Sequence, residues 1–450
     1  MLESLITQNE GKTLEFKENT KSLQSIVKAV ISFANTAGGV IIIGVSDKDK
    51  KIIGLEDPLL EEERLASVIA DSIEPLVIPD IQIVSFRNRE LLLVQVPHMV
   101  GPFYLKSAGL EKGTFVRLGS TNRVADHQTI LSLQLLAKNT SFDELPVLSA
   151  KISDIDDELL KICLMPVYRE LTQKNYESLG LLARQNNKSY PTNAGLLLCG
   201  RVSERLSYFP DSTIACVCFS DETHAEILDQ QEIKAPLIKA HEEVLSFIGR
   251  NTRLGAKIQA SVREDIPQYP PQAVREALIN AIVHADYSMR GTRIQVSIFS
   301  NRIEITNPGS LAYGQTMALA LSGVSRMRNR VIGRLFREIK LIEQLGTGLK
   351  RMLSVYEKVN AKPPIFQELN THFRVTLFSV DMLKNKLNVW EKLLIEKLEK
   401  IQELGTTEIA KLWGVTTRTA RTRLNKMLEA GLVNRIATSP QDPQAVFKLK

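Results

Sequence analysis

The last 60 residues carry the pattern that most constrains what this chain can fold into. Residues 391–403 form one amphipathic segment, in which apolar side chains recur at the spacing of a helix face. Thr406 is a good N-cap for a second helix, and Gly414 permits the left-handed turn that ends it. Thr416 or Thr417 then caps a third helix. This order predicts a compact module of three helices.

The third helix of this module is basic. Positions 417–428 hold four basic and no acidic residues, and we expect all four on the exposed side: Arg418, Arg421, Arg423 and Lys426. Two short strands follow, with a wing at 439–443 between them. In helix-turn-helix proteins the second helix of the motif enters the major groove. We therefore predict a winged helix-turn-helix over residues 386–450 that binds nucleic acid; the alternative is a winged helix that contacts another protein.

The net charge of the chain is concentrated in the same module. The whole sequence has a formal charge of +6. From Lys386 to Lys450 there are 12 Lys and Arg against 7 Asp and Glu, which leaves +5 in this segment. Such an asymmetry predicts an anionic partner for this end of the chain. We expect DNA, with RNA as the alternative.

The cysteines and the apolar runs predict a cytoplasmic protein. The four cysteines, Cys163, Cys199, Cys216 and Cys218, form no Cys-x-x-Cys pair, so we expect buried thiols at Cys216 and Cys218 and a reducing compartment. The N-terminus has no basic segment followed by an apolar one, so we expect no signal peptide. The longest apolar run, at residues 40–45, is too short to span a bilayer. We expect no association with a membrane.

A second group of polar residues lies on a predicted helix at residues 271–284. Glu276 and Asn280 are four positions apart and share a face, which His284 continues. A carboxylate and an amide at this spacing are able to orient a water molecule and to ligate Mg²⁺. Taken alone, the three residues would be interpreted as a half-exposed polar stripe. However, a hairpin follows, ending in the glycine turn at 307–309.

A second glycine segment, Gly346-Thr347-Gly348, then precedes a further helix and would let backbone amides approach a phosphate. This order of motifs resembles the GHKL ATP-binding fold of gyrase and the histidine kinases. The resemblance implies that Asn280 binds Mg²⁺ and that Glu276 activates water. It also implies that Gly346 and Gly348 line the phosphates of ATP or ADP, and that Asn307 and Gly309 lie at the adenine.

The sequence departs from the GHKL pattern at the adenine site. The family's adenine-binding Asp is replaced by Asn307, and a later glycine of the same motif is replaced by Leu311. Asn still accepts a hydrogen bond from an exocyclic amine, but it lacks the charge of Asp. We therefore expect weak, magnesium-dependent binding of ATP or ADP, with slow or absent hydrolysis.

The N-terminal residues carry three further motifs. They are Leu14-Glu15-Phe16-Lys17, Phe33 to Gly39 leading into a buried strand that finishes at Asp47, and Gly113 to Arg117 with Asn122-Arg123. Together they closely resemble the schlafen/AlbA-like domain over most of residues 8–126. With the segments around 191–196, 276–288 and 305–309, nearly the whole chain resembles a bacterial family of schlafen-domain, ATP-binding-type proteins. Its members are usually described as transcriptional regulators.

The schlafen resemblance also implies an alternative, enzymatic function. Glu10, Glu15 and Asp47 match in type and order the metal-binding carboxylates of schlafen ribonucleases. They would hold Mn²⁺ or Mg²⁺ that activates water, and Lys17 would neutralise the phosphate. The simpler interpretation is that Glu15 and Lys17 pair on a sheet face. We also expect the N-terminal domain to offer a second nucleic-acid surface that includes Arg117 and Arg123.

We therefore predict an α+β multidomain protein. The expected domains are a schlafen/AlbA-like α/β domain (1–139), a middle α/β region (140–262), a GHKL-like α/β sandwich (263–380) and the winged helix-turn-helix (386–450). The favoured function is a DNA-binding regulator or defence-type protein with a nucleotide-binding core. The alternatives are a metal-dependent endoribonuclease and a dimerising scaffold with a vestigial ATP site. We expect a homo-oligomer.

Overall fold

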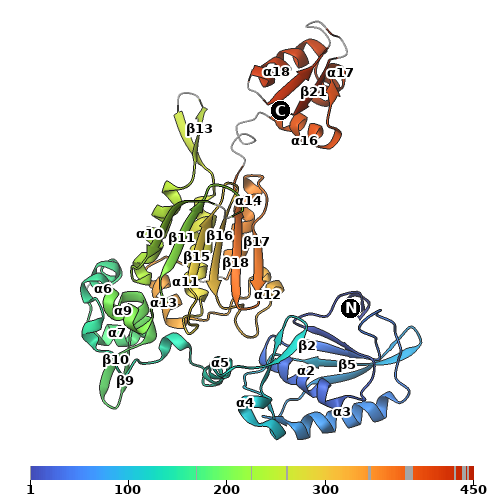
Figure 1. Ribbon diagram of the computed structural model, residues 1–450, viewed down its shortest axis with the longest axis vertical. Coiled ribbons are helices and arrows are strands. Elements are labelled where there is room, and N and C mark those ends of the chain that lie inside the picture. Colours follow the sequence, from blue (N-terminus) through green and yellow to red (C-terminus); the bar gives the residue numbers. More distant parts are fainter. Residues whose placement is uncertain are drawn as a thin grey trace. The chain divides into compact units, whose positions relative to one another are not determined.

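The computed structural model describes residues 2–168, 170–223, 226–259, 262–342, 346–380, 389–429, 432–437, 442 and 445–449. The chain divides into two compact units. The first comprises Met1–Thr252 and Tyr269–Phe378, and the second comprises Arg253–Gln268 and Ser379–Lys450 (Figure 1). No helix among the described residues has the length and apolar character needed to cross a membrane.

The N-terminal part of the first unit alternates helices and strands. Its elements are α1 (Leu2–Ile6), β1 (Leu14–Lys17), α2 (Leu23–Asn35), β2 (Gly39–Ile43), α3 (Pro58–Ser72), β3 (Ile73–Glu74), β4 (Asp80–Phe86), β5 (Arg89–Val96), β6 (Tyr104–Leu105), η1 (Lys106–Ala108), α4 (Gly109–Gly113), β7 (Phe115–Leu118), β8 (Thr121–Val124), α5 (His127–Ala137) and η2 (Phe142–Glu144). The predicted buried strand is present as β2, but it ends at Ile43 and not at Asp47, and α2 precedes it.

The N-terminal sheet has the order β1-β2-β5-β4, with β1 and β2 parallel. Side chains alternate across a strand, so β2 serves two cores. Ile41 and Ile43 pack with α2 and α3 on one face, while Ile42 packs with Leu14 and Phe16 on the other. Because both faces are covered, β2 is apolar throughout, as strands buried on both faces are.

The rest of the first unit contains a group of short helices and a large sheet. Its elements are η3 (Ile152–Asp154), α6 (Asp157–Leu164), α7 (Gln173–Leu179), β9 (Leu182–Gln185), β10 (Lys188–Pro191), α8 (Asn193–Cys199), α9 (Val202–Tyr208), β11 (Ile214–Phe219), β12 (Ile227–Ile233), α10 (Leu237–Arg250), α11 (Pro271–His284), β15 (Ile294–Ile298), β16 (Arg302–Pro308), α12 (Met317–Ser322), α13 (Arg330–Glu338), α14 (Gly348–Lys358), β17 (Ile365–Leu369) and β18 (His372–Phe378). Cys216 and Cys218 are both buried and unbridged on β11.

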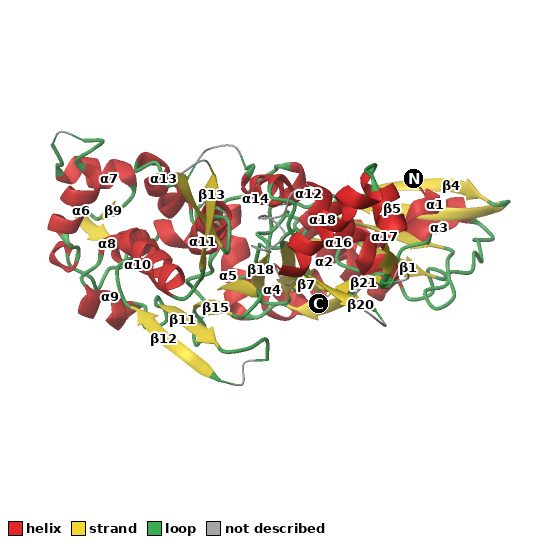
Figure 2. Ribbon diagram, turned by 90° about the horizontal axis from the view of Figure 1, so that it is seen from above, coloured by secondary structure: helices red, strands yellow, loops and turns green. Residues whose placement is uncertain are grey.

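The large sheet has six strands in the order β12-β11-β15-β16-β18-β17. The predicted hairpin is confirmed as the antiparallel pair β15 and β16. Helices α10 and α11 lie on one side of β11, β12 and β15 (Figure 2). The sheet and its helices share one large core, so they form a two-layer α/β unit.

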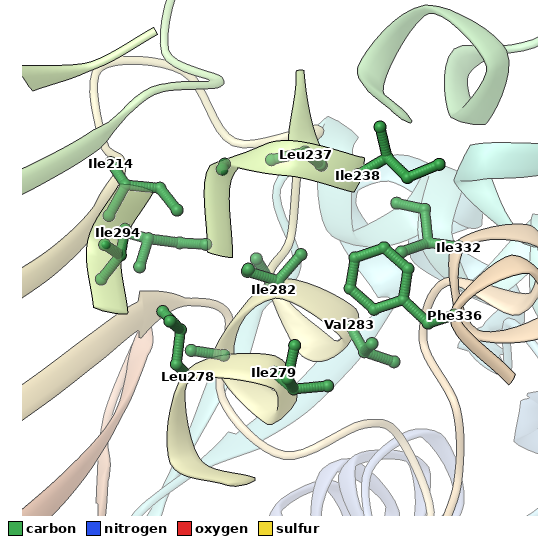
Figure 3. Close-up of a cluster of buried hydrophobic side chains, with 14 of the residues drawn as sticks. Ile214, Leu237, Ile238, Leu278, Ile279, Ile282, Val283, Ile294, Ile332 and Phe336 are labelled. Carbon is green, nitrogen blue, oxygen red and sulfur yellow. The ribbon is translucent and has the colours of Figure 1, made fainter. Parts of the chain in front are cut away.

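Helix α11 holds this core together. Pro271 occupies its first turn, where the missing N–H costs nothing. Eight of its 14 residues are buried. Figure 3 shows Leu278 and Ile282 beside Ile214 and Ile294 of the sheet, and Val283 beside Phe336 of α13. Its apolar side is thereby fixed in the core, and its polar stripe faces the opposite way.

The second unit contains a hairpin and the predicted helical module. Its elements are β13 (Leu254–Gln259), β14 (Val262–Pro267), α16 (Val389–Ile401), β19 (Leu404–Gly405), α17 (Thr406–Trp413), α18 (Thr417–Glu429), β20 (Val433–Ile436) and β21 (Val446–Leu449). The three predicted helices are present, and β19, β21 and β20 form a three-stranded sheet. Of the predicted wing at 439–443, only residue 442 lies within the described residues.

The helix ends in this module follow local capping rules. Gly414 has φ +62° and ends α17, as predicted. Thr416 accepts a hydrogen bond from the N–H of Thr419 at 3.3 Å and so caps α18. The prediction that Thr406 caps α17 is wrong by one residue. Gly405 takes the cap position, because the chain leaves strand β19 there and the Glu408 carboxylate binds its N–H at 2.9 Å.

Candidate functional site

A cavity of about 380 Å³ runs along the polar stripe of α11. Glu276, Asn280 and His284 line it from that helix, which places the three side chains over about 12 Å at 1.5 Å per residue. From other elements come Asn307 of β16 and the two glycines of the 346–348 segment, Gly346 and Gly348. The structure therefore brings together all but one of the residues that the GHKL resemblance assigned to nucleotide binding.

One end of the cavity lies where α11 meets the start of α14. Asn280 Nδ2 donates to Glu276 Oε1 at 3.2 Å. A Cβ at position 348 would lie 3.0 Å from Asn280 Nδ2 and closer still to the Glu276 carboxylate, so only glycine fits there. Arg351, in the first turn of α14, places Nη1 3.7 Å from Glu276 Oε2. Asn280 Oδ1 has no hydrogen-bond partner among the described residues, which leaves a neutral oxygen suited to Mg²⁺.

The other end of the cavity contains Asn307, which is 4% exposed. Its Nδ2 donates to the Pro308 carbonyl oxygen at 3.0 Å, so the amide orientation is fixed and Oδ1 is the atom left to accept a hydrogen bond. Burial and the nearby Arg328 guanidinium lower the pKa of His284 to about 4. His284 is therefore neutral at physiological pH. Gly309 does not line this cavity; its φ of +91° and missing Cβ let the Arg328 guanidinium approach the turn.

Four arginines that were not predicted from the sequence also line the cavity: Arg326, Arg328, Arg337 and Arg351. Glu276 is the one acidic residue among the described lining residues. Arg328 Nη1, Arg337 Nε and Gln315 Oε1 are buried without a hydrogen-bond partner, although Arg328 Nη1 lies 3.7 Å from the Asp286 carboxylate. Buried polar atoms in native proteins are nearly always satisfied, so the Arg337 Nε donor points to an anionic ligand, whereas Gln315 Oε1 is an acceptor and would need a donor. Five arginines within residues 326–337 were the available signal.

The N-terminal acidic residues are arranged differently from the metal-site prediction. Glu15 is 4% exposed, and its carboxylate binds the Arg117 guanidinium and, at 2.5 Å, Lys17 Nζ. Glu10 accepts a hydrogen bond from the N–H of Phe16 at 2.7 Å. Asp47 is exposed and pairs with Lys50 at 3.1 Å. Each carboxylate therefore already has a local partner.

The predicted metal site at Glu10, Glu15 and Asp47 is not assembled. Among the described residues, no three His, Cys, Asp or Glu side chains are grouped in a way that would hold a metal ion. The simpler interpretation, an ion pair between Glu15 and Lys17, is the one that the structure has. The side chains of Lys17 and Arg117 bind the Glu15 carboxylate, which was predicted to bind a metal ion.

The prediction that Arg117 contacts nucleic acid is wrong. Its side chain is fully buried, and it donates to the carbonyl oxygens of Gly11 at 3.0 Å and Leu14 at 3.2 Å as well as to Glu15. Arg117 thus ties β7 to β1. Arg123, on the adjacent strand β8, is exposed and remains available to a ligand.

Helix α18 presents most of its predicted basic face to solvent. Arg418, Arg421 and Lys426 are exposed, while Ala420, Leu424 and Met427 are buried in the module's core. Arg423 departs from the prediction, because its side chain is half-buried and lies over two tryptophan rings. No acidic residue occurs between residues 417 and 428 of the sequence, alongside these exposed cations.

Two segments of the first unit match known families. Residues 10–126 match the family described as "Schlafen, AlbA_2". Residues 291–377 match the HATPase_c_4 family, described as "Putative ATP-dependent DNA helicase recG C-terminal". The chain therefore combines an N-terminal Schlafen/AlbA_2 domain with a RecG-like HATPase_c_4 region. The first region contains the N-terminal sheet, and the second contains β15, β16, β17 and β18 of the six-stranded sheet.

Individual relatives are distant. An uncharacterized ATP-binding protein of Ureaplasma parvum is 21% identical over 196 residues, which are 41% of this chain and 53% of that protein, so the match spans about half of the relative's length. The crystal structure of the DIP2311 protein of Corynebacterium diphtheriae is 20% identical, with a TM-score of 0.45, and covers 100% of this chain and 96% of that one. The N-terminal domain of a "Putative ATP-dependent DNA Helicase RecG-related Protein" of Nitrosomonas europaea is 29% identical, with a TM-score of 0.23, and covers 28% of this chain and 92% of that one.

Proposed function

We propose that this protein is a DNA-binding regulator whose core binds an adenine nucleotide. The observation that carries the proposal is the cavity along α11, where Glu276, Asn280, Asn307 and two glycines meet a set of four arginines. A concave site with few acidic groups, backbone-accessible glycines and arginine forks is suited to a polyphosphate. The name of the Ureaplasma relative, an ATP-binding protein, supports the same ligand.

The two ends of the cavity would bind different parts of the nucleotide. Asn307 Oδ1 would accept a hydrogen bond from the exocyclic amine of adenine. At the other end, the N–H groups at the start of α14 and Asn280 would hold the phosphates, with Asn280 Oδ1 on Mg²⁺. Mg²⁺ would supply charge neutralisation at the phosphates. Arg351 holds the Glu276 carboxylate, which favours binding of the nucleotide over its hydrolysis.

Nucleotide binding is tested by titration calorimetry of the full chain with ATP and ADP, with and without Mg²⁺. We expect weak binding that Mg²⁺ strengthens, and an Asn280→Ala variant whose affinity no longer depends on Mg²⁺. Ser322→Ala, outside the cavity lining, is the matched control. Absence of heat with every adenine nucleotide would support a vestigial site and overturn this part of the proposal.

DNA binding is assigned to α18. In the second unit, α17 and α18 are joined by the turn at Gly414, and a three-stranded sheet accompanies them, which supports the proposal of a winged helix-turn-helix. Arg418, Arg421 and Lys426 would contact phosphates and base edges in the major groove. The net charge of +5 in this segment favours a polyanion over a protein partner.

Salt dependence provides the test of DNA binding. Each lost phosphate contact reduces the slope of log K against log salt by about 0.9. We expect the full-chain triple variant Arg418→Ala, Arg421→Ala and Lys426→Ala to bind duplex DNA more weakly and with a slope lower by about 2–3. Lys397→Ala, an exposed cation on α16, should behave as the parent does. Equal affinity and slope for the triple variant and the parent would contradict the assignment.

A further inference from the structure

The outward side of α18 carries a narrow polar stripe. Arg421, Thr422 and Asn425 lie three, four and seven residues after Arg418, and all four are exposed. Residues at these spacings share one helix face. The Asn425 amide makes no hydrogen bond to any other described residue, so both its donor and its acceptor are available to a ligand.

Arg423 leaves this stripe and turns toward the first two helices of the module. Its guanidinium carbon lies 5.0 Å from the ring centroid of Trp390 on α16 and 5.7 Å from that of Trp413 on α17. The two rings pack edge to face, with centroids 5.2 Å apart. Trp413 Nε1 also donates to the Trp390 carbonyl oxygen at 2.6 Å. One side chain of α18 therefore joins all three helices.

We propose that Asn425 is the base-selecting residue of α18 and that Arg423 is a positioning residue that does not touch DNA. The ligand of the stripe is a DNA duplex with adenine opposite Asn425. This inference rests on the proposed function, because it assumes that α18 is the helix that enters the major groove. It adds which side chain selects the DNA sequence and which side chain holds the helix in position for that contact.

The chemistry of the stripe separates base reading from phosphate contact. The side-chain amide of Asn pairs with N6 and N7 of adenine through two hydrogen bonds, a geometry unique to the major-groove edge of that base. Arg418 and Arg421 are able to bind phosphates on any sequence, or guanine where one is present. Asn425 therefore contributes sequence preference, whereas the arginines contribute mostly affinity.

The role of Arg423 follows from the geometry of a helix in a groove. A rotation of α18 by about 20° would move a side-chain tip about 5 Å from the axis by about 2 Å, which breaks a hydrogen bond of ordinary length. Ala420, Leu424 and Met427 bury the opposite face but are apolar and tolerate small rotations. The stacked guanidinium of Arg423 is directional and resists such a rotation.

The first experiment tests base selection with the full chain. Duplexes selected from a random pool by the parent protein should carry a preferred adenine, and replacing it should weaken parent binding by about 10-fold. Asn425→Ala should bind both duplexes equally, with the parent's salt slope. An unchanged preference in Asn425→Ala would overturn the inference. If the parent protein binds no duplex at all, the proposed function is overturned instead.

The second experiment uses tryptophan fluorescence, because Trp390 and Trp413 are the two tryptophans of the chain. Arg423→Gln should change the emission and reduce the preference for the selected duplex by about 10-fold, without changing the salt slope. Arg423→Lys, which keeps a cation over the rings, should restore part of the preference. Arg421→Ala should lower the salt slope and leave the emission unchanged. A lowered slope in Arg423→Gln would identify it as a phosphate contact and overturn its positioning role.

Discussion

Gly348 lies against the carboxylate of Glu276, so that the backbone of α14 and a side chain of α11 meet with no room for a Cβ between them. The first turn of α14 therefore approaches the polar stripe of α11 as closely as its backbone allows. This contact forms one end of the cavity and brings the N-terminal amides of α14 to the position proposed for the phosphates.

The first prediction is that Gly348→Ala weakens nucleotide binding with little loss of fold. The added methyl group would force Glu276 and Asn280 apart, and we expect an affinity for ATP at least about 10-fold weaker, because a 1.4 kcal/mol loss is enough for that change. Gly249→Ala is the matched control, since nothing lies within 4 Å of its Cβ position in α10. Titration calorimetry of both variants measures their affinities for ATP. Equal affinities would show that the close contact is unimportant.

The second prediction concerns Arg337, whose Nε is buried without a hydrogen-bond partner beside the cavity. If an anionic ligand is the missing partner, Arg337→Gln should weaken binding of ATP by about 10-fold or more and binding of adenosine very little. Arg334→Gln, an exposed residue of the same helix, should leave both affinities unchanged. Equal losses for ATP and adenosine would mean that Arg337 supports the fold and makes no contact with phosphate.

The third prediction is a pH dependence that arises from His284. Its pKa is about 4 in the folded protein against 6.5 for the free side chain, because it is buried near Arg328. Between about pH 4 and 6.5 the His284 ring is therefore protonated in the unfolded chain and neutral in the folded protein. Stability should fall as the pH drops from about 6.5 to 4, by at most about 3 kcal/mol, and level off below that.

Thermal unfolding between pH 4 and 8 measures this effect, and His284→Gln should reduce the fall. The ring resonances of His284 in an NMR titration should give the pKa directly. A ring that titrates near 6.5 would remove the predicted contribution and leave other groups to explain any acid destabilisation.

The bounds of α11 were predictable from local signals, because Pro271 fixes the start and the apolar period continues to His284. The spacing of Glu276 and Asn280 on that helix likewise placed them on one face. The arginines of the cavity were not predictable in the same way. Arg337 and Arg351 come from two different helices, and only tertiary packing brings them to α11.

The N-terminal domain shows why the period of a strand is an incomplete guide. Alternation correctly put Glu15 and Lys17 on one face of β1, but that face is covered by Arg117 and not by solvent or metal. A signal for the burial of Arg117 existed, since it lies two residues after the buried Phe115 and so shares its face. Its charge argued for exposure, and the buried partner Glu15 made burial possible.

The fourth prediction tests the nuclease interpretation that the acidic residues first suggested. The full chain incubated with tRNA and Mn²⁺ should leave the RNA intact, because the Glu15 carboxylate is bound by Arg117 and Lys17 and is not grouped with Glu10 and Asp47. Cleavage by the parent that disappears in Glu15→Gln, with the fold retained, would establish the metal-dependent enzyme. Cleavage by both would indicate a contaminating nuclease.

The last prediction is that the Glu15–Arg117 pair stabilises the N-terminal domain. Removing one partner of a buried ion pair leaves the other charge buried, which typically costs about 3–5 kcal/mol. We expect Arg117→Ala to approach this loss, reduced where Lys17 compensates Glu15. The double variant with Glu15→Ala should be less destabilised than the sum of the two single variants by more than about 1 kcal/mol. Arg123→Ala, on the neighbouring strand but exposed, should be within about 0.5 kcal/mol of the parent.

Hydrogen exchange of β1 and β7 is the appropriate measurement, because a chain with several domains does not unfold in a single two-state transition. Arg117 donates to the backbone carbonyls of Gly11 and Leu14 in addition to Glu15, so its loss should accelerate exchange in β1 as well as in β7. Exchange faster in β7 alone would confine the role of Arg117 to its own strand. Additive effects of the two substitutions would mean that the charges do not stabilise each other, and the pair would then no longer account for the absence of a metal site.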